Sequence, residues 1–198
     1  MELANTRTDR RVLRSKLALK QALLKLMSEK SFSSISITEI VELANYNRGT
    51  FYTHYEQKEA LLEEVINELI EELIAAFREP YDHVELFHVN ELTANSVTLF
   101  EHIYSRKEEY TVLFRSDALP MVKDQMFNSV KRILNEDLEY AYGEINPELL
   151  QAYSTHALMG LVFHWIEGGF KYEPPYMQKQ LIAILHWRPK TAKTHVKK

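Results

Sequence analysis

One long segment, residues 58–77, constrains the fold more than any other part of the chain, because apolar side chains recur along it every three or four positions. These side chains are Leu61, Leu62, Val65, Ile66, Leu69, Ile70, Leu73, Ile74 and Phe77. Glutamates fall on the opposite side of the same segment, and Pro80 follows it. This spacing is the period of an α-helix with one wide apolar face. The segment therefore predicts a long amphipathic helix that ends before the proline.

The composition favours helices throughout. Only five of the 198 residues are glycine, which leaves little material for hairpins and tight loops, and 45% are hydrophobic, enough for a substantial core. The chain has no cysteine, which excludes disulfide scaffolds, cysteine-ligated zinc and iron–sulfur sites, and thiol catalysis. We therefore expect an all-α protein.

We expect neither a membrane span nor a signal peptide from this sequence. The longest apolar run, residues 157–163, is far shorter than the ~20 residues that a membrane helix requires. The basic N-terminus has no apolar segment behind it. We expect a cytoplasmic protein without a membrane partner.

Four helices are predicted in the first third of the chain. The first covers residues 12–30, with Leu13, Leu17, Leu24 and Met27 on one side and Leu19, Leu23 and Leu26 widening the stripe. A polar loop at 31–34 separates it from a short helix. Ser36 and Glu39 have the spacing of a capping box at the start of that helix, and Asn45 tolerates the left-handed turn at its end. Asn47 opens the next short helix, which runs to Tyr55, and the long helix follows from Lys58.

The remainder of the chain predicts further helices with identifiable breaks. Breaks are expected near Glu91, near Arg106, around 116–120 and at 143–147. Asn146 and Pro147 make a good helix start, and that helix should run to Glu167 before two glycines. A last short helix is predicted at 176–187, and the polar, basic tail at 191–198 should be frayed.

Charge is distributed unevenly between the two ends. Residues 1–30 carry eight basic and three acidic side chains, and residues 1–60 have a net charge of +3, against −7 for the remainder. A basic end on an acidic body indicates a polyanionic partner for the first part of the chain. The alternative is a solvated helix face that happens to carry lysines, and charge alone does not separate the two.

The two short helices and the tight turn between them have the arrangement of a helix-turn-helix. The second helix concentrates polar and planar side chains, namely Arg48, Thr50, Tyr52, Thr53 and His54, while Phe51 and Tyr55 face inward. Side chains at the N-terminal end of such a helix can enter the major groove of DNA. Arg48 can form a bidentate pair with a guanine; a phosphate contact and plain solvation remain open for it.

Residues 35–55, ISITEIVELANYNRGTFYTHY, followed by KEAL at 58–61, resemble the signature of the TetR/AcrR family. The match extends over about residues 10–70. Three residues depart from the pattern: Asn45 replaces the usual turn glycine, Tyr46 the usual valine and Val41 the usual alanine. Asn45 can still adopt the turn. The two larger side chains should change the angle between the short helices slightly, and with it the operator sequence.

The resemblance implies an N-terminal three-helix DNA-binding domain at 1–57, with the motif at about 36–55, joined by a long fourth helix to a ligand-binding and dimerisation domain within 58–198. A homodimer would place two recognition helices on a palindromic operator in double-stranded DNA. Carried over by position, the resemblance implies phosphate contacts for Ser36, Thr38 and Lys58, base or phosphate contacts for Asn47, Arg48, Gly49 and Thr50, and backbone or thymine contacts for Tyr52, Thr53 and His54. Arg14 and Lys16 would add salt-dependent affinity.

The second part of the chain contains many aromatic and methionine side chains that suit an apolar effector pocket. The candidate ligand residues are Tyr104, Tyr110, Phe114, Phe127, Tyr153, His156, Phe163, His164 and Trp165. Each could instead fill the core. Residues 157–166 and 177–185 are apolar on nearly all sides. This favours a four-helix bundle between two subunits, with internal packing as the alternative.

Other chemistries find little support. His83 and His88 would lie about 140° apart around a helix and make a poor metal pair. The glycines are too scattered for a phosphate loop. We predict no metal, no cofactor and no catalysis. We expect a repressor that is released from its operator when a small molecule binds and tilts the long helix. The alternatives are a helical binding or interaction module that no longer reads DNA and, more remotely, an enzyme that uses the same pocket.

Overall fold

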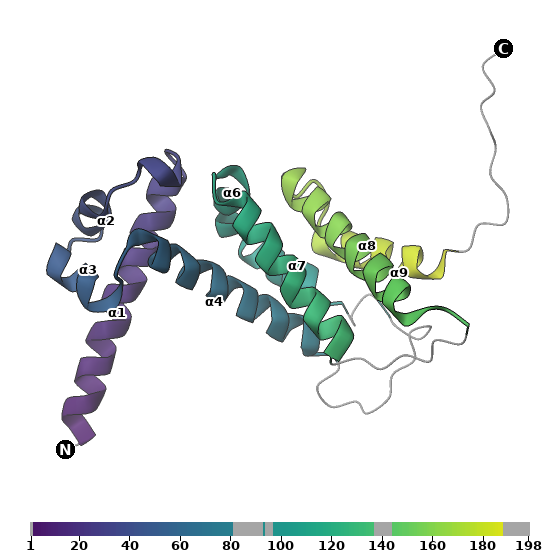
Figure 1. The fold of residues 1–198 in the computed structure, drawn as a ribbon, viewed down its shortest axis with the longest axis horizontal. Coiled ribbons are helices and arrows are strands. Elements are labelled where there is room, and N and C mark those ends of the chain that lie inside the picture. The colour runs from purple at the N-terminus through teal and green to yellow at the C-terminus, as the bar shows by residue number, and fades with distance from the viewer. Residues whose placement is uncertain (1, 81–92, 94–96, 137–143, 188–198) are drawn as a thin grey trace, which may run out of the picture.

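The fold is described from a computed structural model, which covers residues 2–80, 93, 97–136 and 144–187, with the side chains of residues 2–9, 135 and 136 excepted. Every regular element in these ranges is a helix (Figure 1). The elements are α1 (Glu2–Met27), the 3₁₀ turn η1 (Phe32–Ser34), α2 (Ile37–Leu43), α3 (Arg48–His54), α4 (Lys58–Arg78), α5 (Leu99–Ser105), α6 (Lys107–Arg115), α7 (Leu119–Glu136), α8 (Pro147–Glu167) and α9 (Pro174–His186). The all-α prediction is confirmed.

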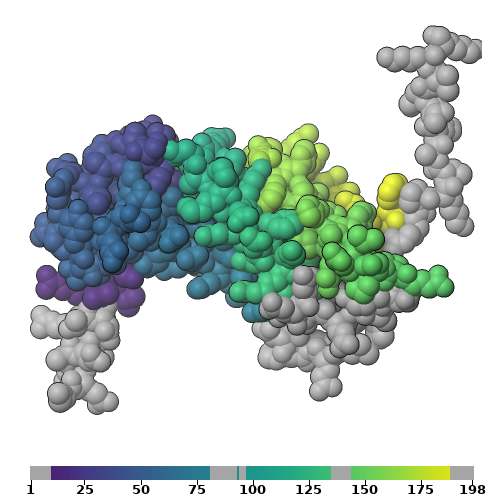
Figure 2. Space-filling model, in the orientation of Figure 1, coloured from purple at the N-terminus to yellow at the C-terminus, as the bar shows by residue number. Residues whose placement is uncertain are grey.

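The helices form two groups joined by α4. We call α1–α3 and their connections, residues 2–57, the head, and α5–α9, residues 97–187, the body. The head lies at one end of the molecule, and α4 runs from it into the body to the lower end of α7 (Figure 1). The space-filling view shows the head joined to the body without a gap on this face (Figure 2).

The long helix α4 serves as the shared core of both groups. Its buried side chains are Leu61, Leu62, Val65, Ile66, Leu69, Ile70, Leu73 and Ile74, as the sequence predicted. The helix packs against α1 in the head and against α5 and α7 in the body. One apolar cluster consequently extends from Leu19 in α1 to Met177 in α9. Burial of this wide stripe fixes the axis of α4 relative to both groups.

The buried face of α1 differs from the predicted one. Leu13 and Leu17 are 66% and 57% exposed, whereas Ser15, Leu19 and Leu23 are buried. Leucines lie on both sides of this helix, and the side that α2, α3 and α4 cover is set by tertiary packing, which periodicity does not reveal. The helix also begins at Glu2, before the predicted start at residue 12. Periodicity did not predict these first turns because they are polar and carry no apolar pattern.

Several predicted helix ends are confirmed. The breaks near Arg106 and around 116–120 separate α5 from α6 and α6 from α7. Asn146 accepts a hydrogen bond from the Leu149 amide at 3.2 Å and caps α8, which ends at Glu167 as predicted. Helix α9 begins at Pro174, two residues early. The break predicted at 143–147 is confirmed in its described part, since residues 144–146 precede α8 without helical structure. The predicted break near Glu91, the His83–His88 pair and the tail at 191–198 lie outside the described residues.

One face of α8 and the end of α9 remain uncovered. On α8, Leu149 and Tyr153 are 67% and 74% exposed, while Met159, Val162 and Trp165 on the same helix are buried. At the end of α9, Ile184 and Trp187 are also exposed. Helix α8, which is apolar nearly all round, therefore buries one side inside the chain and presents apolar groups on the other.

Candidate nucleic-acid interface

Helix α2 begins with the capping box that the sequence predicted. The Glu39 amide donates to Ser36 Oγ at 3.3 Å, and the Ser36 amide donates to Glu39 Oε2 at 2.9 Å. Lys30 also donates to the Glu39 carboxylate. The bond from Lys30, followed by those from Ser36, lowers the pKa of Glu39 to about 2. The start of α2 is thus fixed by local bonds that use the Ser36 hydroxyl within the protein.

A second cap fixes the start of α3. Asn47 Oδ1 accepts from the Thr50 amide at 2.9 Å and lies 3.3 Å from the Thr50 hydroxyl. A Cβ on Gly49 would lie only 3.2 Å from this same Oδ1, so glycine leaves room for the cap. Thr53 donates to the Gly49 carbonyl at 2.8 Å. Between α2 and α3, Asn45 has φ of 58°, which confirms the left-handed turn.

Arg48 is held at the exposed tip of α3 by α2. Its Nε donates to Thr38 Oγ1 at 3.1 Å, and its Nη2 donates to the same oxygen. The guanidinium remains exposed to solvent with further N–H groups free to donate. Tyr52, one turn along the same helix, is 56% exposed. The structure therefore brings Thr38, Arg48 and Tyr52 to the outer surface of the helix-turn-helix.

Two other predicted contact residues are engaged inside the protein. His54 Nε2 lies 2.7 Å from Ser15 Oγ on α1, and burial lowers the pKa of this histidine. Lys58 donates to the carbonyls of Phe32, Ser33 and Ile35 at 2.7–3.0 Å. These three bonds use all three ammonium hydrogens. The DNA contacts assigned to His54 and Lys58 remain predictions, and both side chains have structural partners in this state.

Lysines and arginines are used differently in the head. Each lysine between residues 10 and 57 forms an ion pair with a glutamate: Lys16 and Lys20 with Glu64, Lys25 with Glu29, and Lys30 with Glu39. Within the described part of the chain, no carboxylate pairs with the four arginines Arg10, Arg11, Arg14 and Arg48, which are all exposed. The uncompensated positive charge of the head is therefore carried by guanidinium groups, which suit phosphate and guanine geometry.

Three of these arginines form a groove that the sequence did not assign. Arg10, Arg11 and Arg14 line a surface pocket of about 470 Å³ together with Tyr46 in the α2–α3 turn. Of the three, sequence reasoning had named only Arg14, as a source of salt-dependent affinity. The sequence signal for this groove was the run of arginines before residue 15. Its meaning depends on α1 continuing to Glu2, which places all three arginines on one helix.

The nine aromatic and histidine residues predicted to bind a ligand differ in burial. Tyr110, Phe114 and Trp165 are buried in the core, and Tyr104, Phe127 and Phe163 pack partly buried against it. Tyr153, His156 and His164 lie on the exposed side of α8. None of the nine lines the pocket beside Arg14 or the pocket between the end of α1 and α6. Their role in ligand binding remains a prediction.

No helix among the described residues is both long and apolar enough to cross a membrane. No group of three or more histidine, aspartate or glutamate side chains in the same ranges could hold a metal ion.

The sequence matches two family models. Residues 19–65 match bacterial regulatory proteins of the tetR family, and residues 90–186 match a transcriptional regulator C-terminal region. The first match includes α2 and α3, and the second includes the body.

Curated relatives and solved structures agree with these matches. The chain is 26% identical over 184 residues to the uncharacterized HTH-type transcriptional regulator YxbF of Bacillus subtilis. The aligned region covers 89% of this chain but only 46% of YxbF, so the chain spans about half the length of that relative. It is 25% identical over 166 residues to the HTH-type transcriptional regulator UidR of Escherichia coli, covering 80% and 82% of the two chains. A TetR transcriptional regulator from Streptococcus agalactiae shares the fold, with a TM-score of 0.57, 22% identity and 91% and 98% coverage.

A capped helix-turn-helix in a head that matches bacterial regulatory proteins, on a body that matches a regulator C-terminal region, defines a helix-turn-helix transcriptional regulator. More specifically, the chain belongs to the TetR family.

Proposed function

We propose that residues 1–57 form the DNA-reading domain of a homodimeric regulator, and that residues 58–198 carry the dimer interface and the site of a small-molecule effector. The observation that carries the proposal is the exposed Arg48 guanidinium, held at the N-terminal tip of α3 by Thr38. A guanidinium fixed at this end of a helix can reach base edges when the helix enters the major groove.

Base reading and phosphate binding are assigned to different side chains of the head and the start of α4. Arg48 reads a guanine through a bidentate pair, with Asn47, Gly49 and Thr50 close to the same base or its phosphate. Ser36, Thr38 and Lys58 contact phosphates, and Tyr52, Thr53 and His54 contact the backbone or thymine methyl groups. The groove of Arg10, Arg11 and Arg14 supports a further phosphate contact, which adds affinity that depends on salt and not on sequence.

The exposed apolar groups of α8 and α9 support the homodimer. Leu149 and Tyr153 on α8 and Ile184 on α9 are exposed in the single chain, and a second copy would cover them in a four-helix bundle. Two-fold symmetry then places two α3 helices on one face of the DNA, as a palindromic operator requires.

We assign the protein the role of a cytoplasmic repressor that binds its effector without turning it over. The effector favours a conformer in which α4 tilts, so that the two α3 helices no longer fit successive major grooves. Helix α4 is suited to transmit the change because it is packed into both the head and the body. Equal operator affinity with and without every effector identified would contradict this mechanism.

The test is a fluorescence-anisotropy titration of the full-length protein with DNA from upstream of its own gene, against scrambled DNA, at several salt concentrations. The proposal predicts selective binding of two protomers per site that weakens steeply as salt increases. If neither this DNA nor a genome-wide selection of fragments yields a selective site, the protein is instead a helical ligand-binding or interaction module.

A further inference from the structure

The turn η1 lies at the junction of head and body, and an aspartate of the body holds it. Asp117 is in the loop between α6 and α7. Its Oδ1 accepts from the Phe32 amide at 2.8 Å, and its Oδ2 accepts from the Ser33 amide at 3.0 Å. Burial would raise the pKa of Asp117, but the bonds from Ser33 and Phe32 outweigh that effect and keep the pKa below its usual value.

The other side of the same turn is held by α4. Lys58, the first residue of α4, donates to the carbonyls of Phe32, Ser33 and Ile35. Its ammonium group lies 4.7 Å from the centre of the Phe32 ring. The amides of Phe32 and Ser33 are thus bonded to the body, and the carbonyls of the same two residues are bonded to the first residue of α4. Two separate parts of the molecule therefore fix one short turn.

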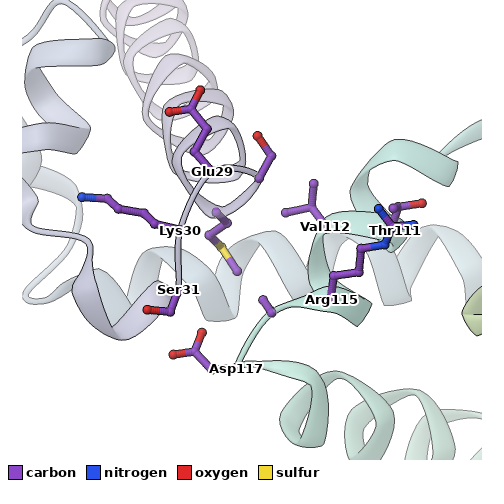
Figure 3. Close-up of a pocket in the computed structure, with 10 residues that line it drawn as sticks. Glu29, Lys30, Ser31, Thr111, Val112, Arg115 and Asp117 are labelled. Atoms are coloured by element: carbon purple, nitrogen blue, oxygen red, sulfur yellow. The ribbon is translucent and has the colours of Figure 1, made fainter.

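Helices α1 and α6 pack against each other at this junction, but they do not fill it completely. A pocket of about 400 Å³ opens between the end of α1 and α6, lined on one side by Glu29, Lys30 and Ser31 and on the other by Thr111, Val112 and Arg115 (Figure 3). Asp117 lies at its edge beside Ser31 (Figure 3). Beside this pocket, the paired bonds of Asp117 tie η1 directly to the body and add to the packing of α1 and α4.

We propose that Asp117 is a positioning residue for DNA reading: by clamping η1 to the body, it fixes the orientation of α2 and α3 in the regulator. The inference rests on the proposed DNA-reading function. The chain runs directly from η1 through Ile35 to Ser36, the N-cap of α2. A shift of η1 therefore moves the start of the helix-turn-helix. In a dimer, such freedom alters the separation of the two α3 helices, on which simultaneous binding to two half-sites depends.

The first test measures orientation without DNA. The chain has no cysteine, so spin labels can be attached to cysteines introduced at Glu42 on α2 and Lys131 on α7, both exposed. Labelled chains are diluted into an excess of unlabelled chains of the same variant. D117N removes the charge and one acceptor oxygen. The control is D124N on α7, an exposed aspartate whose bond is to Asn128 on the same helix.

We expect a narrow distribution of label distances in the parent and in D124N, and a broader one in D117N at unchanged helix content. Equal distributions in D117N and D124N would overturn the proposal. If D117N does not fold, D117E carries the measurement, because it keeps the charge while displacing the carboxylate by one methylene.

The second test uses operators whose half-site spacing is changed by one base pair. We expect D117N to lose about tenfold in affinity for the natural spacing, about 1.4 kcal/mol, and to discriminate less between spacings than the parent. A merely destabilised protein would lose affinity equally for both spacings, and that result contradicts a positioning role. If no variant binds any DNA selectively, the proposed function fails, and the label distances alone decide the role of Asp117.

Discussion

The head and the body of this regulator organise their polar side chains in different ways. In the head, Ser36 and Asn47 cap consecutive helices through bonds to residues three positions away, and Arg48 is fixed by Thr38 ten positions earlier. In the body, Tyr110 is fully buried and its hydroxyl has no hydrogen-bond partner within the described residues. Short-range polar bonds therefore shape the exposed surface of the helix-turn-helix, whereas Tyr110 in the body is held by packing alone among the described residues.

The largest effect that sharpens this comparison concerns the body core. Phe100 is fully buried, with its ring 5.3 Å from that of Trp165. Phe100→Ala should lower the free energy of unfolding by about 3–5 kcal/mol, since it leaves a cavity in a core shared with α4. Urea denaturation measures the change. Tyr52→Ala, at an exposed aromatic residue of the head, should change the free energy of unfolding by only about 0.5 kcal/mol. Equal losses for the two variants would contradict the difference in burial between Phe100 and Tyr52.

A smaller effect is expected at the outer face of α8. Tyr153→Glu should raise the dimer dissociation constant roughly 30-fold, the equivalent of about 2 kcal/mol, because a charge replaces an exposed aromatic group at the proposed interface. Analytical ultracentrifugation measures the constant. Lys131→Glu on the exposed side of α7 is the control and should leave it unchanged. A Tyr153→Glu protein that remains as dimeric as the control would exclude this face from the dimer.

The left-handed turn between α2 and α3 should give an effect of about 1 kcal/mol. Asn45 has φ of 58°, a conformation that disfavours residues with a Cβ but that asparagine tolerates. Asn45→Ala should therefore lower the free energy of unfolding by about 1 kcal/mol, measured by urea denaturation. Asn45→Gly, which matches the usual family residue, should be at least as stable as the parent. An alanine variant as stable as the glycine variant would argue against strain at this turn.

The smallest effect is a dependence on acid pH. The pKa of Glu39 is lowered from 4.5 to about 2, chiefly by Lys30. A carboxyl group whose pKa is lower in the folded state stabilises the protein above its unfolded pKa, and this contribution is lost as the pH falls from about 4.5 toward 2. Glu39→Gln keeps the capping geometry without the charge. Its stability should vary less than that of the parent over this pH range in thermal melts; identical pH profiles would contradict the assignment.

Sequence patterns predicted the features that depend on neighbouring residues. The capping box at Ser36, the turn at Asn45, the long apolar stripe of α4 and the bounds of α8 from Asn146 to Glu167 follow from bonds or packing within a few positions, and the structure confirms them. The helix-turn-helix was accessible to sequence reasoning for the same reason.

Features that depend on distant residues were missed. The sequence pattern placed Leu13 and Leu17 of α1 in the core, yet both are exposed, because helices elsewhere in the chain select the covered face. The bonds from Lys58 to the carbonyls of Phe32, Ser33 and Ile35 join residues more than 20 positions apart, and no sequence pattern indicated them. Asp117 bonds to η1 across 84 and 85 positions. No local pattern signals such contacts.

The central claim, that the tip of α3 reads bases, is tested most directly by a double-mutant cycle between Arg48 and the guanine it contacts. Affinities of the parent and of Arg48→Ala are measured for the operator and for operators with each guanine replaced, with Arg132→Ala on the exposed side of α7 as the control. We predict that one guanine replacement weakens the parent and the control by about 1–3 kcal/mol but leaves Arg48→Ala almost unaffected. Equal losses for all three proteins at every guanine would show that Arg48 does not read DNA.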